Sequence, residues 1–300
     1  MQLSLGQQTR SKCSTCGMEY VPSSIEDRKL HQKYHRQNSE GYDVGDVFVD
    51  QTLKPRRMRG LKSGDYVIMV DAFDLHHRKR RAHAALEIVQ RELGAVEIPH
   101  NDIWKSQPDD LSHRESKYRS YMYIRGTKCI GYLLVEQLDK AYAVLNSAAS
   151  TDTTTAAAGD KEEKSAKKIS ALAALRARKE QLAQELADCA SQPLKCADVD
   201  SPAVMGVSRI WTSPVHRKQN IATALLDAAV KFHNEFAETS RNLPPPTSDL
   251  SPELKDTVVP PYKRPNIVRR DQVAFSQPTE SGARLARKWI GKAYGWLVYL

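Results

Sequence analysis

Hydrophobic and polar positions form a clear pattern in one segment near the C-terminal end of this 300-residue chain. An apolar, β-branched run over 204–211 leads into a short basic turn at 217–220, and apolar residues at helical spacing follow over 221–230. The pattern predicts a strand, a cationic turn and a helix. Such a turn can aim backbone N–H groups and a helix N-terminus at a phosphate. A solvated basic corner is the alternative interpretation, because the turn contains neither GxxxxGK[ST] nor GxGxxG.

The same kind of pattern predicts mixed α and β structure elsewhere. Strands are expected over 64–70, 118–124, 129–138, 272–275 and 296–300, and helices over 81–93 and 285–290.

Two segments look like insertions. Residues 147–160 are small and polar, which predicts a flexible linker, and an amphipathic helix is expected over 161–187. For that helix, a solvated surface insertion is favoured over an oligomerisation helix. The proline-rich segment 238–265 is expected to be a loop insertion.

Composition limits the class of protein. No run of eighteen apolar residues is present, so no membrane span is expected, and the first residues lack the pattern of a signal peptide. The net charge of +9 favours an acidic partner. Five cysteines, an odd number, do not suggest a disulfide framework and favour a reducing, intracellular compartment.

Cysteine and histidine spacing near the N-terminus predicts a metal site. Two thiolates, Cys13 and Cys16, would come from a hairpin knuckle, and two imidazoles, His31 and His35, from adjacent turns of one helix. We therefore expect a small C2H2-type ββα finger over residues 1–40 that holds a structural Zn²⁺. A docking role is favoured over sequence-specific DNA reading, because the chain has one finger with mixed charges at the start of its helix.

Two basic clusters, 54–59 and 76–81, follow the finger. Either could be a nuclear import signal or a patch that contacts the phosphates of DNA in chromatin. A solvated helix start is the alternative for the second cluster.

The basic turn at 217–222 resembles the R/Q-x-x-G-x-G/A loop of acetyltransferases similar to the histone acetyltransferase Gcn5, and this resemblance implies that the segment binds acetyl-coenzyme A. Its pyrophosphate would lie over 217–222, and the strand ending at 210–212 would hydrogen-bond the pantetheine arm. An acceptor lysine, with a pKa of about 10.4, must lose a proton before it attacks the thioester. The candidate proton acceptors are Asp227, Asp271, Glu280 and, through ordered water, Ser208.

Taken together, these segments resemble the cohesin acetyltransferases, the Eco1/Esco family. The resemblance rests on the CxxCGM…HxxxH finger and on four further segments: CIGYLLVE at 129–136, GVSRIW at 206–211, RKQNIA at 217–222 and VAFSQPT at 273–279. It covers most of 12–145 and 203–300 and omits the two insertions.

The resemblance implies an α+β architecture, the Gcn5-related N-acetyltransferase fold, in which helices flank a mixed, mostly antiparallel sheet behind the zinc finger. Residues 41–146 and 196–300 would form the two parts of that domain, separated by a disordered or helical insertion at 147–195. The implied reaction moves acetyl from acetyl-CoA to lysines on the ATPase head of cohesin's SMC subunit. This acetylation would establish sister-chromatid cohesion in the nucleus in S phase, with chromatin and the replication machinery as further partners.

Residue by residue, the resemblance implies catalytic roles for Asp227 and Ser208. The implied acetyl-CoA contacts are Ile210, Trp211, Thr212, Arg217, Lys218, Gln219, Asn220, Ile221, Ala222, Thr223, Thr279, Glu280 and Ser281. Gln277 stands where animal members have Asp. An amide cannot act as a base, so that role must pass to Asp227, Ser208 or water, or be unnecessary.

Two alternative functions remain open. One is a catalytically weak, chromatin-binding adaptor that keeps the fold, supported by Gln277 and by Asn220 at a glycine position of the loop. The other is an acetyltransferase for a different substrate, such as histone tails.

Overall fold

The computed structural model describes residues 10–14, 16–105, 116–146, 194–242 and 267–299, together with 176, 178 and 180. The chain divides into two compact units. The first comprises 1–137 and 207–268, and the second comprises 138–206 and 269–300. The predicted domain parts, 41–146 and 196–300, do not coincide with these units. The predicted linker at 147–160 and most of the predicted helix at 161–187 lie outside the described residues.

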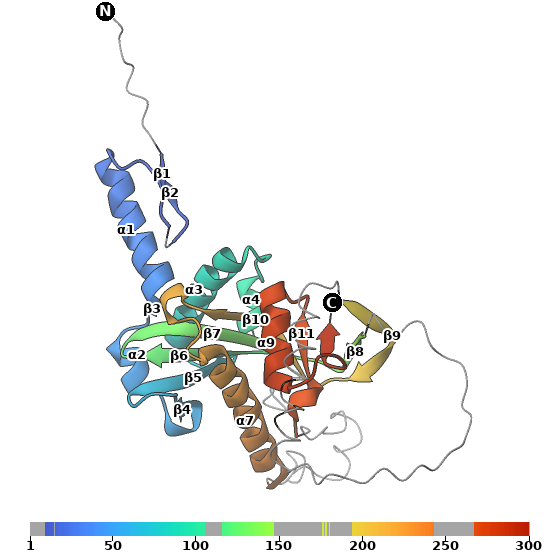
Figure 1. The fold of residues 1–300 in the computed structure, drawn as a ribbon. Coiled ribbons are helices and arrows are strands. Elements are labelled where there is room, and N and C mark those ends of the chain that lie inside the picture. The colour runs from blue at the N-terminus through green and yellow to red at the C-terminus, as the bar shows by residue number, and fades with distance from the viewer. Residues whose placement is uncertain are drawn as a thin grey trace, which may run out of the picture. The chain divides into compact units, whose positions relative to one another are not determined.

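The first unit begins with the predicted ββα finger (Figure 1). Strand β1 (Ser11–Lys12) pairs antiparallel with β2 (Glu19–Tyr20), and helix α1 (Ile25–Glu40) follows. The hydroxyl of Ser24 caps the start of α1 by accepting a hydrogen bond from the Asp27 N–H at 3.2 Å.

An antiparallel sheet forms the centre of the first unit. Its strands are β3 (Tyr42–Asp43), β4 (Arg57–Arg59), β5 (Asp65–Asp71), β6 (Tyr118–Arg125), β7 (Lys128–Gln137) and β10 (Met205–Thr212), of which β10 belongs to this unit from Val207 onward. The order is β4-β5-β6-β7-β10, and β3 pairs with β7. The pairs from β4 to β7 and the β3–β7 pair are antiparallel. The strands predicted over 64–70, 118–124 and 129–138 are therefore confirmed.

The first unit also contains four α-helices besides α1 and two 3-10 turns among its described residues: α2 (Asp46–Asp50), η1 (Lys54–Arg56), α3 (His76–Leu93), α4 (His100–Trp104), η4 (Pro214–His216) and α7 (Ile221–Asn242). Helix α3 begins five residues before the predicted start at Arg81. Helix α7 continues to Asn242, so the predicted start of an irregular insertion at Glu238 was wrong.

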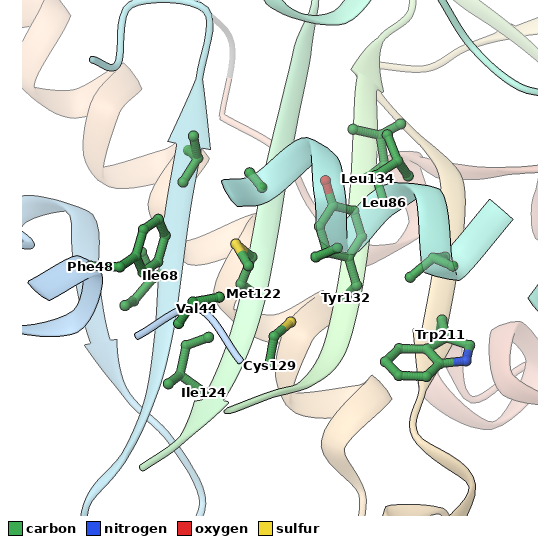
Figure 2. Packing of buried hydrophobic residues seen from close by; sticks show 14 of the residues in the cluster. Val44, Phe48, Ile68, Leu86, Met122, Ile124, Cys129, Tyr132, Leu134 and Trp211 are labelled. Carbon is green, nitrogen blue, oxygen red and sulfur yellow. The ribbon is translucent and has the colours of Figure 1, made fainter. Parts of the chain in front are cut away.

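Helices α3 and α7 cover opposite faces of this sheet. Leu86 of α3 packs with Met122, Tyr132 and Leu134 in one buried cluster (Figure 2). Gly131 of β7 instead faces Ile221 of α7. Neighbouring residues of a strand point to opposite faces, so α3 and α7 sandwich β7.

The second unit is smaller. Its elements are β8 (Lys140–Leu145), β9 (Lys195–Pro202), η5 (Arg270–Gln272), β11 (Val273–Ser276), α9 (Glu280–Ile290) and β12 (Leu297–Tyr299). Strands β11 and β12 are parallel, whereas β8 pairs antiparallel with both β12 and β9. Ala141, Ala274 and Leu297 belong to the buried cluster of this unit.

The observed pairing is mixed and mostly antiparallel, so the α+β fold class is confirmed. Strands β8 and β9 were not predicted, and α9 begins five residues before the predicted start at Leu285. Among the described residues, no helix is both long and apolar enough to cross a membrane.

Candidate functional site

The four predicted zinc ligands come together in the finger. The ligating atoms of Cys13, Cys16, His31 and His35 all lie within 4.8 Å of one another, and each residue is half-buried. A knuckle turn brings the two cysteines together: the Gly17 N–H donates to the Cys13 carbonyl at 2.9 Å, and Gly17 adopts a left-handed φ of 71°.

The surroundings of these four residues fit Zn²⁺. The imidazole of His31 stacks on Tyr20 with ring centroids 4.1 Å apart, and its buried Nε2 atom has no hydrogen-bond partner. A buried polar atom without a partner is costly unless a ligand satisfies it. Burial and the neighbouring Cys13 thiol raise the pKa of Cys16, which disfavours its thiolate form. Two thiolates this close together therefore need a cation between them. The two cysteines and two histidines would hold a structural ion.

The same helix that carries both histidines continues into the sheet-bearing part of the first unit. The Ser213 hydroxyl, just before η4, donates to the Ser39 carbonyl in a buried hydrogen bond, and Lys128 pairs with Glu40. One rigid helix therefore links the metal ligands to the segment that precedes the basic turn.

The predicted phosphate loop precedes α7. Lys218 and Asn220 adopt left-handed φ angles of 62° and 60°, a conformation that turns successive backbone N–H groups toward one side. The first N–H groups of a helix have no partner within it, and in α7 the Ala224 N–H donates to the Asn220 carbonyl at 3.0 Å. The loop and the N-terminus of α7 therefore offer a set of amide donors to an anion.

Close packing fixes the position of this helix end. A side chain at Gly131 would place its Cβ 2.6 Å from Ile221 Cγ2, so β7 and the first turn of α7 approach more closely than any larger residue permits. The Ser213 N–H donates to the Ile130 carbonyl at 2.9 Å and ties the segment before the loop to the same strand. Sequence reasoning missed Gly131, because its partner lies ninety positions further along the chain.

Several predicted acetyl-CoA contacts cannot act through their side chains. Trp211 and Ile221 are both buried, and Trp211 belongs to the core cluster of the first unit (Figure 2). Any contact from these residues must come from their backbone. Arg217, Lys218 and Asn220 are exposed, whereas Ile210, Thr212, Gln219, Ala222 and Thr223 are half-buried.

The two predicted catalytic residues lie in the first unit. Ser208 is half-buried in β10, and its carbonyl accepts a hydrogen bond from the Arg209 guanidinium at 2.8 Å. Asp227 is half-buried in α7, in the second turn after the loop.

The remaining predicted contacts belong to the second unit. Thr279 caps α9 by accepting a hydrogen bond from the Gly282 N–H at 3.3 Å, and the exposed residues Glu280 and Ser281 form its first turn. Glu280 pairs with Arg284, and Asp271 pairs with Arg269 at 3.4 Å. These two carboxylates are exposed and each pairs with an arginine, whereas Asp227 is half-buried.

Gln277 has an unusual backbone in the same unit. Its φ is 26°, and its N–H donates to the Tyr299 carbonyl at 3.3 Å. Positive φ angles in residues other than glycine concentrate at functional sites. Gln277 is also the residue at which the sequence was expected to depart from the family that it resembles.

Both basic clusters contribute to the fold. Arg56 pairs with Asp71 at 2.9 Å and with Asp74 at 2.7 Å, and Arg78 pairs with the other oxygen of Asp74 at 3.0 Å. Lys79 donates to the Ala72 carbonyl at 2.9 Å. The cations that remain exposed are Lys54, Arg59, Arg80 and Arg81.

Comparison with protein families agrees with both parts of this description. Residues 1–37 match the zinc finger of the acetyltransferase ESCO, and residues 201–242 and 250–299 match the ESCO1/2 acetyltransferase.

Three relatives span nearly the whole chain. The N-acetyltransferase eso1 of Schizosaccharomyces pombe is 26% identical over 92% of the chain, ECO1 of Saccharomyces cerevisiae 24% over 93%, and human ESCO2 22% over 96%. The chain spans 83% of the budding-yeast relative but only 23% of eso1 and 35% of ESCO2.

Among solved structures, the chain is similar to the xEco2 acetyltransferase domain bound to a K105-CoA conjugate. The match has a TM-score of 0.44 and 19% identity, and covers 79% of this chain and 92% of that chain.

Proposed function

The chain belongs to the Eco1/ESCO family of acetyltransferases, and from this premise we propose that it transfers acetyl from acetyl-CoA to lysines on the ATPase head of cohesin's SMC subunit. It would act in the nucleus in S phase, on chromatin and close to the replication machinery. The observation that carries the proposal is the amide-lined loop at the start of α7, with Lys218 and Asn220 in left-handed conformations.

Acetyl-CoA would bind through its pyrophosphate to this loop. Backbone N–H groups of residues 218–223 and the positive end of the α7 dipole would hold the two phosphates, and Arg217 would add a mobile charge. The backbone of β10 at 210–212 would hydrogen-bond the pantetheine arm and polarise the thioester carbonyl. Residues 279–281 at the start of α9 are further candidate contacts.

The transfer itself is an attack by a neutral lysine amine on the thioester carbon. The new C–N bond forms as the C–S bond breaks, CoA leaves as the thiolate or thiol, and the amine gives up one proton. Asp227 would accept that proton directly, or Ser208 would accept it through an ordered water. A positioned base of this kind contributes about 10²- to 10⁴-fold to the rate.

The left-handed conformation of Asn220 weakens the alternative of an inactive adaptor. Asn is among the residues that tolerate this conformation best after glycine, so its presence at a glycine position leaves the loop shape intact. Gln277 does not weaken the proposal either, because Asp227 offers a half-buried carboxylate as the proton acceptor in its place.

The test is an acetylation assay with labelled acetyl-CoA and purified SMC heads, read by mass spectrometry of acetyl-lysine. The proposal expects acetyl-lysine on the heads and a loss of about 10²-fold or more in kcat for Asp227→Asn, with unchanged affinity for acetyl-CoA. Ser208→Ala measures the water route in the same assay, and Lys231→Gln, an exposed change on the same helix, is the matched control.

Two results would overturn parts of this proposal. Heads that stay unmodified while histone tails become acetylated would reassign the substrate. An Asp227→Asn enzyme with full activity would remove Asp227 as the base and leave Ser208 and water.

A further inference from the structure

An arginine at the end of β6, next to the β6–β7 turn, contacts the phosphate loop. Arg125, the last residue of β6, donates from Nη1 to the side-chain oxygen of Gln219 at 3.3 Å. Gln219 lies in the loop, between the two left-handed residues. The guanidinium of Arg125 therefore lies next to the amide donors that precede α7, although the two residues are 94 positions apart.

A buried carboxylate holds this guanidinium in one orientation. Arg125 donates from Nε and Nη2 to the two oxygens of Asp65 at 3.0 and 2.8 Å, and the Tyr123 hydroxyl donates to Asp65 at 2.7 Å. Burial alone would raise the pKa of Asp65, but the hydrogen bonds from Arg125 and Tyr123 lower it below its ordinary value. Asp65 therefore stays ionised and presents a guanidinium of fixed geometry, as in preorganised anion sites.

The surroundings of the loop carry more positive charge than their carboxylates can neutralise. Burial and the nearby charges of Arg125, Lys62 and Lys128 lower the pKa of His216, which places these three cations around the turn before the loop. Arg125 is paired with Asp65, and Lys128 with Glu40. Within the described part of the chain, no carboxylate lies within ion-pairing distance of Lys62, Arg217 or Lys218.

These cations lie in two places. Arg217 and Lys218 belong to the loop itself, beside the amide groups assigned to the pyrophosphate. Arg125, at the end of β6, lies beside Gln219. Lys62 lies in the turn between β4 and β5, where its charge acts on Asp65 and His216. Both would face a ligand group that extends beyond the pyrophosphate. Besides the two phosphates of its pyrophosphate, coenzyme A carries a third, the 3′-phosphate of its ribose, a monoester with nearly two negative charges at neutral pH.

We propose that Arg125, positioned by Asp65 and assisted by Lys62, forms a binding subsite for the 3′-phosphate of coenzyme A. The proposal rests on the proposed use of acetyl-CoA. It assigns this chain a preference for CoA over dephospho-CoA, which lacks only that phosphate.

The test is isothermal titration calorimetry with CoA and with 3′-dephospho-CoA. The unaltered chain is expected to bind CoA about ten- to a hundred-fold more tightly than dephospho-CoA, the range of a hydrogen bond between charged groups. Arg125→Gln should remove most of this difference and leave dephospho-CoA affinity nearly unchanged. Lys62→Gln should reduce the difference about two- to five-fold.

Controls separate a binding effect from a folding effect. Arg125→Gln leaves Asp65 buried without its cation, so the double variant Asp65→Asn/Arg125→Gln is measured alongside it. Lys62 is exposed, and Lys62→Gln therefore tests the subsite without disturbing the core. Lys231→Gln, about 15 Å along α7 from its first residue, is the matched control and should bind both ligands normally.

Each outcome has one meaning. Equal affinity of the unaltered chain for CoA and dephospho-CoA overturns the subsite while the proposed function stands. An equal loss for both ligands in Arg125→Gln also overturns it, since Arg125 would then only support the loop. Failure of the unaltered chain to bind either ligand overturns the proposed function itself.

Discussion

Replacing Gly131 by alanine tests how the sheet positions the phosphate loop. The new Cβ would lie 2.6 Å from Ile221 Cγ2, 3.2 Å from Leu225 Cδ1 and 3.3 Å from Tyr123 Cβ. The first of these contacts is shorter than atoms tolerate, and Ile221 is the first residue of α7. The start of α7, with its amide donors, must therefore move away from β7.

The cost follows from the packing. An extra methyl group in a close-packed core costs about 1–3 kcal/mol. For a domain of this size, each kcal/mol lowers Tm by about 2–4 °C, so a mid-range cost of about 2 kcal/mol predicts a fall of about 4–8 °C. If about 1 kcal/mol of the strain is carried by the displaced helix end, acetyl-CoA affinity falls about five-fold.

A double-mutant cycle identifies the contact responsible. Ile221→Ala removes the atom that Gly131→Ala would strike, at its own cost of about 2–5 kcal/mol. The double variant should therefore be more stable than the sum of the two single changes predicts, by about 1 kcal/mol or more. Stability is measured by denaturant unfolding and affinity by calorimetry.

The control for this cycle is Gly206→Ala. Its Cβ would strike Leu138 and Tyr299 at 2.6 and 2.8 Å, so it should destabilise the protein without coupling to Ile221→Ala. If the changes in unfolding free energy caused by Gly131→Ala and Ile221→Ala simply add, or if Gly131→Ala leaves Tm unchanged, the close contact between β7 and Ile221 does not position α7.

Three further predictions concern the loop, the finger and Asp65. Asn220→Gly should keep its affinity for acetyl-CoA, measured by calorimetry. Asn220→Val should lose about 1–2 kcal/mol of folding stability, because a β-branched residue tolerates the left-handed φ poorly. Equal Tm values of the two variants in thermal melts would contradict the left-handed conformation. Chelation of Zn²⁺ should lower the helical circular dichroism signal and the Tm, as should Cys13→Ser without chelator; an unchanged melt would rule out a structural ion. The lowered pKa of Asp65 stabilises the folded state fully above the ordinary pKa of 3.8, and this stabilisation is lost as pH falls toward the folded-state pKa. Asp65→Asn should therefore flatten the fall of the unfolding free energy with decreasing pH, measured by denaturant unfolding. An unaltered dependence of that free energy on pH would contradict the ion pair.

Local patterns sufficed for the elements that carry the site. The Cys and His spacing predicted the finger, because one knuckle and one helix set all four ligand positions. The apolar run and the helical repeat around the basic turn predicted β10 and the start of α7, because each element buries one regular face.

Other features depend on residues far apart in the sequence. Asp65 meets Arg125 because β5 and β6 pair in the register that places these two residues opposite each other. Gly131 resembles any strand glycine until α7 lies upon it. Strand β9 was not predicted, because its side chains are largely exposed and lack alternation. The early start of α3 escaped because Arg78 and Lys79 read as solvated charges, although both bond within the fold.

The central claim is that the loop before α7 holds acetyl-CoA for attack by a lysine. The most direct measurement is a structure of this chain with a conjugate of CoA and a lysine peptide from the SMC head. We expect pyrophosphate oxygens within about 2.7–3.2 Å of the N–H groups of residues 218–223, and Asp227 or a Ser208-bound water within hydrogen-bond reach of the lysine nitrogen. A conjugate bound elsewhere, with no phosphate at the start of α7, would contradict it.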